Sequence, residues 1–267
     1  MDPTRPVFTI GISTIGPRAA RLVELVSGRP ELSFIVAHQL MGESSLSEEF
    51  SQFRNCTYVP LTNVGLSASR NVVLEKCITK YVLISDDDVD YPSDLTNKLD
   101  VVLREFSSYA AIIGKIRNDC GQYFKSYRTR RSHGYIDYFR VSSIEMVLNV
   151  DFLKSKNIRF DEQFGLGSTY PSGEELILLM DMRSNGALVT FVDTVLGIHP
   201  SVSTGSRLLT DPDVGMEKGP MIRRAFGFRR GMFYMALFLM RIALKKGMQH
   251  KRAFSLATVR SFFHFKP

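Results

Sequence analysis

The sequence contains few cysteines. Cys56, Cys77 and Cys120 are odd in number and widely spaced, so they indicate neither a disulfide framework nor a zinc-ligand pattern, and they favour a reducing compartment. The first residues also lack the basic and then apolar segments of a secretory signal. These two absences lead us to expect a cytoplasmic protein.

Long hydrophobic runs are missing as well. Near the C-terminus, the apolar run from Met232 to Met240 is far shorter than the ~20 residues that a membrane-spanning helix needs. We also find no internal repeat and no low-complexity tract. With 267 residues, of which 44% are apolar, the chain can bury one large core, or one core with an appendage.

Acidic residues are absent from the last part of the chain. Residues 218–267, here called the basic tail, contain 12 Lys or Arg and no Asp or Glu, so the net charge of +7 divides into −5 for residues 1–217 and +12 for the tail. Such an excess indicates an anionic partner, either nucleic acid or a membrane surface. Residues 1–217 offer no basic groove and no base-stacking platform, so we do not expect nucleic acid.

The basic tail also has the pattern of an amphipathic helix. Its apolar residues recur at spacings of three, four or seven, which places them on one helical face: Ile222, Phe226, Phe233, Leu237, Met240 and Leu244. We therefore expect a main domain at 1–217 and a helical tail at 218–267 that lies on an anionic membrane surface. Packing of the tail on the main domain, or a contact within an oligomer, is the alternative.

Short apolar runs alternate with helix-like stretches along the main domain. Strands are expected at 7–14, 32–39, 57–61, 81–85, 110–116 and 187–193, with helices after Pro17 and at 67–79 and 92–106. This alternation indicates an α/β, Rossmann-like fold with a mainly parallel sheet flanked by helices. In such sheets, ligands bind at the carboxyl ends of the strands.

An acidic cluster follows one of these strands, at Asp86, Asp87, Asp88 and Asp90. Neighbouring carboxylates raise one another's pKa and cost stability unless a cation or hydrogen bonds compensate. The cluster is either a solvated loop or a site, and its place at a strand end favours a site. A carboxylate pair such as Asp86 and Asp88 suits Mg²⁺ or Mn²⁺ held against a nucleotide diphosphate.

Two other kinds of acidic site use similar clusters of aspartate. A calcium-binding EF-hand loop that began at Asp86 would need Gly where Tyr91 stands and Glu where Asn97 stands. An aspartyl-phosphatase motif would need Thr or Val at the position of Asp90. The EF-hand is excluded, and the phosphatase motif matches poorly.

Several segments together resemble the family 2 nucleotide-sugar glycosyltransferases of bacterial surface-polysaccharide synthesis, which have the GT-A fold. These are Asn63–Asn71 (NVGLSASRN), the acidic strand end, the segment Arg159–Gly167 (RFDEQFGLG) and the Gly-Glu-Glu at 173–175. The resemblance covers roughly Val7 to His199. It implies a metal-dependent, inverting transfer of a sugar from a nucleoside-diphosphate sugar, expected to be a UDP-sugar. The acceptor would be a hydroxyl of a glycan or lipid-linked saccharide, at the inner face of the cell membrane.

The resemblance also assigns roles to residues. Glu175, or else Glu174, would take the proton from the acceptor hydroxyl. The metal would be held by Asp88, Asp86 and His199, and the donor would be bound by Ser13, Thr14, His38, Arg70, Asn71, Asp86 and Asp87. Many relatives carry an acid at the position of His38, so the base of the donor stays open. Ser203, Thr204 and Arg207 would close over the phosphates, and the basic segment 125–135 would flank the acceptor.

Each of these roles has a structural alternative. The two glutamates can simply cap a helix, Arg70 can be an exposed helix residue, and a single histidine is usually structural. At the level of function, a sugar-1-phosphate nucleotidyltransferase shares the fold and the metal, although Gly11, Gly16 and Arg18 do not form its dense glycine-rich motif. A membrane-bound binding protein with a degenerate site is the alternative that is not an enzyme.

Overall fold

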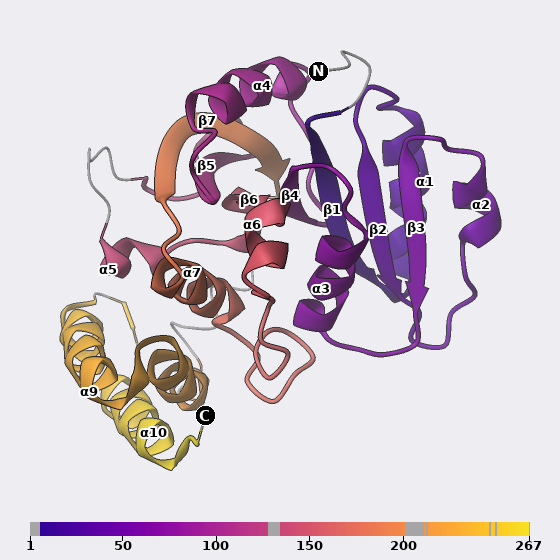
Figure 1. The fold of residues 1–267 in the computed structure, drawn as a ribbon. Helices are drawn as coiled ribbons and strands as arrows, with labels where there is room; N and C mark the ends of the chain where they lie inside the picture. The colour runs from indigo at the N-terminus through magenta and orange to yellow at the C-terminus, as the bar shows by residue number, and fades with distance from the viewer. Residues whose placement is uncertain are drawn as a thin grey trace.

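The fold is that of a computed structural model, which describes residues 6–127, 134–200, 211, 213–245, 247–248 and 250–266. In this described part, seven strands form one sheet in the order β3-β2-β1-β4-β6-β5-β7 (Figure 1). The strands are β1 (Phe8–Ile15), β2 (Phe34–Gln39), β3 (Cys56–Leu61), β4 (Tyr81–Asp86), β5 (Ala111–Asn118), β6 (Met146–Asn149) and β7 (Val189–His199).

Helices connect and cover the strands. Between β1 and β5 along the chain, these are η1 (Gly16–Ala19), α1 (Ala20–Ser27), α2 (Ser47–Ser51), α3 (Leu66–Lys76) and α4 (Leu95–Glu105). They are followed by α5 (Tyr135–Tyr138), η2 (Ser143–Glu145), α6 (Val150–Ser155), α7 (Glu174–Ser184), α9 (Val214–Leu244) and α10 (Lys251–His264). The predicted α/β class with a mostly parallel, helix-flanked sheet is confirmed.

One strand departs from the parallel arrangement. β1 pairs in parallel with β2 and β4, β2 with β3, and β5 with β7, whereas β6 is antiparallel to both β4 and β5. β6 was not predicted from the sequence, because a run as short as Met146–Asn149 shows no periodicity that separates a buried strand from a helix.

Hydrophobic residues fill both faces of the sheet. Along β4, Tyr81 and Leu83 belong to the cluster that packs against α1 and α4, while Val82 and Ile84 belong to the cluster that packs against α3 and α7. Successive side chains of a strand point to opposite faces, so a strand covered on both faces is apolar throughout. This explains the continuous apolar run that ends at the acidic cluster.

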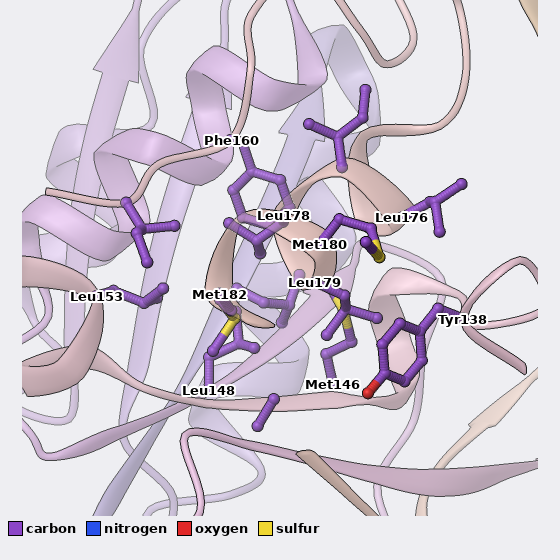
Figure 2. Packing of buried hydrophobic residues seen from close by; sticks show 14 of the residues in the cluster. Tyr138, Met146, Leu148, Leu153, Phe160, Leu176, Leu178, Leu179, Met180 and Met182 are labelled. Atoms are coloured by element: carbon purple, nitrogen blue, oxygen red, sulfur yellow. The ribbon is translucent and has the colours of Figure 1, made fainter. Parts of the chain in front are cut away.

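The helix α7 is buried on almost every side. Residues from Leu176 to Met180, and Met182, have at most 7% of their surface exposed, and Figure 2 shows them packed against Leu148, Leu153 and Phe160. Contacts with α9 cover the side that faces away from the sheet. A helix enclosed by neighbours in this way needs no polar stripe.

The basic tail packs on the main domain at its start. α9 begins before residue 218, and Met221, Ile222 and Phe226 join the core that contains α7. The division expected between residues 217 and 218 therefore falls inside a helix, and it stays a prediction.

The helix α9 is interrupted at Gly227, whose φ of 69° and ψ of −173° are not helical. The apolar residues expected on one face are consequently divided. Ile222 and Phe226 are buried in the protein, whereas Phe233 and Leu244, beyond the break, are 62% and 76% exposed. No helix within the described residues is long and apolar enough to cross a membrane.

Candidate active site

The carboxyl ends of β1, β2 and β4 meet at one edge of the sheet. Ser13 lies opposite Asp86 in the register of β1 with β4, and Thr14 lies opposite His38 in the register of β1 with β2. Four of the predicted site residues are thus brought together at the edge where doubly wound sheets bind their ligands.

Asp87 is held by the segment that follows β1. Its carboxylate accepts a hydrogen bond of 2.7 Å from Thr14 Oγ1 and another from Arg18, while Arg21 Nη1 donates to its backbone carbonyl at 2.8 Å. Burial raises the pKa of Asp87, against the hydrogen bond from Thr14 and the charge of Arg18, which lower it. Both oxygens of this carboxylate are therefore used within the protein, where they fasten β1 and η1 to the end of β4, and the backbone carbonyl of Asp87 fastens α1 through Arg21.

Arg70, on α3, is the centre of a buried charge cluster. Its side chain is 1% exposed, and Nη1 donates to Glu174 Oε1 at 2.9 Å. Nη2 donates to Asp86 Oδ1 at 3.2 Å and to Ser143 Oγ at 2.7 Å. Burial works against its charge, but Asp86, Glu174 and Glu175 outweigh that cost and raise the pKa of the guanidinium. Arg70 therefore joins the end of β4 to the start of α7.

Glu174 and Glu175 open α7, where the helix N-terminus favours negative charge. Glu174 is buried and bound to Arg70, whereas the Glu175 carboxylate lies 4.0 Å from Arg70 Nη1 and its side chain is 20% exposed. Burial, reinforced by Glu174, raises the pKa of Glu175 to about 8. Glu174 is therefore paired with the charge of Arg70, whereas Glu175 has a raised pKa of about 8.

The residue before this pair ties it to the tail. Gly173 has a φ of 103°, in the left-handed region that favours glycine, and a Cβ at this position would clash with Met221 of α9. Ser172 in addition donates to Glu217 Oε2 at 2.8 Å and accepts from Lys218 Nζ at 2.8 Å. The first turn of α7 is therefore in direct contact with α9.

Asp88 and His199 lie side by side because Asp90 pairs with Ile198 in an isolated antiparallel bridge. His199 Nε2 is 3.3 Å from Asp88 Oδ1, and its Nδ1 is 2.7 Å from the carbonyl of Pro200. Since a carbonyl can only accept, Nδ1 carries a hydrogen. The contact with Asp88 raises the pKa of His199 and so favours the charged ring, which donates from Nε2; only the neutral ring would offer a lone pair at Nε2 to a metal. His199 lowers the pKa of Asp88, against the effect of burial.

A divalent cation fits this pair of side chains. Asp88 Oδ1 is buried, and its contact with His199 Nε2 at 3.3 Å does not reach the geometry of a good hydrogen bond; a buried oxygen that is satisfied so poorly is costly unless a further group binds it. Asp86, the other predicted carboxylate ligand, is 34% exposed and already accepts from Arg70. The carboxylate at this edge of the cluster suits Mn²⁺ or Mg²⁺, and the added imidazole nitrogen favours the softer Mn²⁺.

The protein alone does not complete such a site in the part of the chain that the structure describes, where no group of three or more His, Cys, Asp or Glu is placed to hold a metal. Mg²⁺ commonly takes one or two carboxylates and fills its other positions with phosphate oxygens and water. The residues present therefore fit a cation that is shared with a bound diphosphate.

Two predicted donor contacts are already engaged inside the protein. His38 is buried, with Nε2 2.9 Å from the Gly16 carbonyl and Nδ1 2.7 Å from the Tyr58 hydroxyl, so Nε2 donates and Nδ1 accepts. Ser13 Oγ accepts from Ser69 at 2.6 Å. Their contact with a donor stays a prediction, and the observed bonds give them a role in shaping the edge of the sheet.

Asn71 also has protein partners. Its side chain donates to the Phe160 carbonyl at 2.9 Å and to Glu162 Oε1 at 2.8 Å, and it accepts from Phe160 N at 2.8 Å. It thereby fixes the segment that leads into α7, and its contact with a donor stays a prediction. Ser203, Thr204, Arg207 and the middle of the segment 125–135 lie outside the described residues.

The sequence reasoning missed Arg18, Arg21 and Ser143. Basic residues one turn after the first strand complement the aspartates of a neighbouring strand end, and this charge pattern was a usable signal. Ser143 is 73 positions from Arg70, and no local sequence pattern predicts a hydrogen-bond partner so distant in the chain.

The fold that surrounds this site is shared with solved structures of S. aureus TarS. The structure of S. aureus TarS 1-349 matches with a TM-score of 0.56 and 14% identity, over 96% of this chain and 72% of that chain. TarS 1-349 in complex with UDP-GlcNAc matches with a TM-score of 0.57 and 13% identity, over 96% and 73%. In complex with UDP, the values are 0.56 and 13%, over 95% and 89%.

No protein-family model matches the sequence, and no curated protein matches it. Identities this low establish the shared fold and leave the chemistry to be argued from the residues. Membership of family 2 therefore stays a prediction.

Proposed function

We propose that this protein is a nucleotide-sugar glycosyltransferase that moves a sugar from a nucleoside-diphosphate donor, first of all a UDP-sugar, to an acceptor hydroxyl. One observation carries the proposal. Buried Arg70 bonds both Asp86, at the donor end of the sheet, and Glu174, at the start of α7. It thus fixes the acidic strand end and the candidate base in one site. The TarS fold, with a structure that holds UDP-GlcNAc, supports the choice of donor.

We assign the general base to Glu175 and a positioning role to Glu174. A base works best when its pKa is close to the working pH, and the pKa of Glu175 is raised to about 8 by burial and by Glu174. Glu174 gives its carboxylate to Arg70 and is only 4% exposed, so it is poorly placed to accept a proton. Glu175 is partly open to an incoming hydroxyl.

Asp88 and His199 would hold a divalent cation, Mn²⁺ or Mg²⁺, together with the diphosphate of the donor. When bound, such a cation supplies Lewis-acid stabilisation of the charge on the leaving group. Glu175 removes the proton of the acceptor hydroxyl while the hydroxyl oxygen of the acceptor bonds to the anomeric carbon of the donor sugar. The bond from that carbon to the diphosphate breaks at the same time. A single displacement with one base inverts the configuration at the anomeric carbon.

The acceptor in this proposal is a glycan or lipid-linked saccharide of a surface polysaccharide, met at the inner face of the membrane. This part rests on the resemblance and on the basic tail, and the donor chemistry does not depend on it.

The decisive experiment compares Glu175→Gln, Asp88→Asn and the wild-type protein with UDP-GlcNAc and other nucleotide sugars in the presence of Mn²⁺. We expect Glu175→Gln to lower the rate of UDP release by about 10²–10⁴-fold, with donor binding measured by calorimetry unchanged. Asp88→Asn should weaken binding of donor and Mn²⁺ together.

The matched control is Asp193→Asn, since Asp193 is an exposed carboxylate on β7 that pairs with Lys115. It should retain the wild-type rate. Release of pyrophosphate from a nucleoside triphosphate and a sugar phosphate would instead identify a nucleotidyltransferase. Full activity in Glu175→Gln would refute the assignment of the base.

A further inference from the structure

Two adjoining hollows lie along α9, and we call them together the α5–α9 trough. The larger lies between the start of α5, the end of α7 and α9 on both sides of Gly227, and the smaller lies between α5 and the half of α9 that follows Gly227. The larger, about 760 Å³, includes Tyr135, Phe233 and Tyr234 in its lining. The smaller, about 430 Å³, shares Tyr234 and adds apolar side chains such as Phe139 and Leu237. Neither hollow includes Asp86, Asp88, Glu175 or His199, so the trough is separate from the candidate active site.

The charge along the α5–α9 trough has one sign. Arg140, Arg241 and Lys245 line the smaller hollow, and no acidic residue is among its described lining. The larger hollow adds Arg229 and Arg230, which are exposed.

Its single acid does not balance these cations. Asp181 lines the larger hollow and is bound by both terminal nitrogens of Arg224, at 3.0 and 2.9 Å. The apolar floor of the trough therefore has an uncompensated basic border.

Large apolar side chains beside the trough face water. Phe233, Met240 and Leu244 are 62%, 56% and 76% exposed. They lie on the same half of α9 as Arg241 and Lys245, whose long side chains can reach past them. Apolar surface together with flanking cations is what an interfacial helix presents to anionic lipid.

We propose that the α5–α9 trough docks the protein on an anionic phospholipid surface, with an acyl chain in the apolar hollow and lipid phosphates at Arg241 and Lys245. Charge selects this occupant over a second copy of the chain, since two troughs facing each other would bring like charges together. This inference specifies where the membrane is met and is independent of the transfer reaction, because it uses none of the catalytic residues.

The test is cosedimentation of the full chain with vesicles of phosphatidylcholine alone, or with 30% (about one lipid in three) phosphatidylglycerol added. We expect binding only to the anionic vesicles. The double variant Arg241→Glu with Lys245→Glu should bind them about 30-fold more weakly or worse, since two surface cations are lost. Leu244→Asp should weaken binding as well, by removing apolar contact.

Matched controls lie on α10, away from the trough. Arg252→Glu with Arg260→Glu changes the net charge of the tail by the same amount, and Leu256, 71% exposed, permits Leu256→Asp as the partner of Leu244→Asp. Both controls should bind within about threefold of the wild-type protein, because charge away from the contact is screened. Calorimetry with UDP-GlcNAc should give equal donor binding in all variants.

Three results would overturn the proposal. These are no binding of the wild-type protein to anionic vesicles, equal binding to neutral vesicles, and equal losses in the α10 controls and the trough variants. A dimer in solution that Leu244→Asp converts to a monomer would likewise overturn it, because the trough would then be an interface between copies. Loss of donor binding in every protein would count against the proposed function and leave the trough unaffected.

Discussion

Charge is used in opposite ways at the two ends of this molecule. At the carboxyl ends of the strands, Arg70 is buried and has Asp86 and Glu174 within 3.2 Å. In the basic tail, 12 Lys or Arg stand without a single Asp or Glu, and cations such as Arg229 and Arg230 are exposed. A buried charge must be paired in fixed geometry, so it defines a site, whereas exposed charges act together as a field.

The largest effect should come from breaking the buried cluster. Arg70→Met leaves the Glu174 carboxylate buried without its cation, so we expect the free energy of unfolding to fall by about 3–5 kcal/mol, measured by urea denaturation. Adding Glu174→Gln should restore part of the loss. The tail control, Arg252→Met, should change stability by less than about 0.5 kcal/mol. Equal losses in Arg70→Met and Arg252→Met would erase the contrast between the two regions.

The pH dependence of stability should be of comparable size. Glu175 has a pKa raised from 4.5 to about 8 in the folded state, so between these values the folded protein binds more protons than the unfolded chain. Stability therefore falls as the pH rises through this range, by roughly 1.4 kcal/mol for each unit of pKa difference. Burial, Glu174 and Asp86 act against the charged form, and Arg70 favours it.

Denaturation at pH 5 and pH 8 measures this dependence. Glu175→Gln should flatten the profile and be more stable than the wild-type protein at pH 8. The control Asp193→Asn should keep the wild-type slope. An unchanged slope in Glu175→Gln would mean that its carboxylate is not the group that titrates.

A smaller effect is expected where the two regions meet. Arg224, on α9, donates to Asp161 at 2.8 Å and to both oxygens of Asp181 on α7, at 3.0 and 2.9 Å. It is 28% exposed, so Arg224→Ala should cost about 1.5–3 kcal/mol, the range for hydrogen bonds to charged groups. Arg230→Ala, on the same helix and exposed, is the control and should cost little. An equal loss of stability in Arg230→Ala would mean that the bonds of Arg224 to Asp161 and Asp181 are not what stabilises the contact between the two regions.

The smallest effect should be found in the tail itself. Arg252→Ala and Arg260→Ala remove exposed cations of α10, and we expect the free energy of unfolding to change by no more than about 0.5 kcal/mol. Thermal denaturation at low and high salt would measure it. A salt-dependent change well above this size would show that the tail charges also serve the folded state.

Much of the main domain could be predicted from the sequence because its central strands, such as β1, β2 and β4, are buried on both faces. The run at Tyr81–Ile84 is apolar throughout and ends in aspartates, which marks both the strand and its functional end. The antiparallel β6 could not be predicted, since its place between β4 and β5 depends on the assembled sheet.

The candidate site divides in the same way. The acidic strand end pointed to Asp86 and Asp88, and the resemblance pointed to the pair Glu174–Glu175 at the start of a helix. The burial of Arg70 was not predicted, because a charged residue on a helix usually faces solvent. Its pairing with three groups distant in sequence is what makes burial tolerable, and such pairing exists only in three dimensions.

The close packing of Gly173 against Met221 has a practical consequence. The residue that precedes Glu174 and Glu175 packs directly on α9, so cutting the chain at residue 218 would remove a contact of the candidate active site along with any lipid-binding surface. Truncation would thus affect the candidate active site and lipid binding at once, whereas point substitutions beyond Gly227 can test lipid binding alone. Because Gly173 packs on Met221 and directly precedes Glu174 and Glu175, a displacement of α9 would also displace the start of α7.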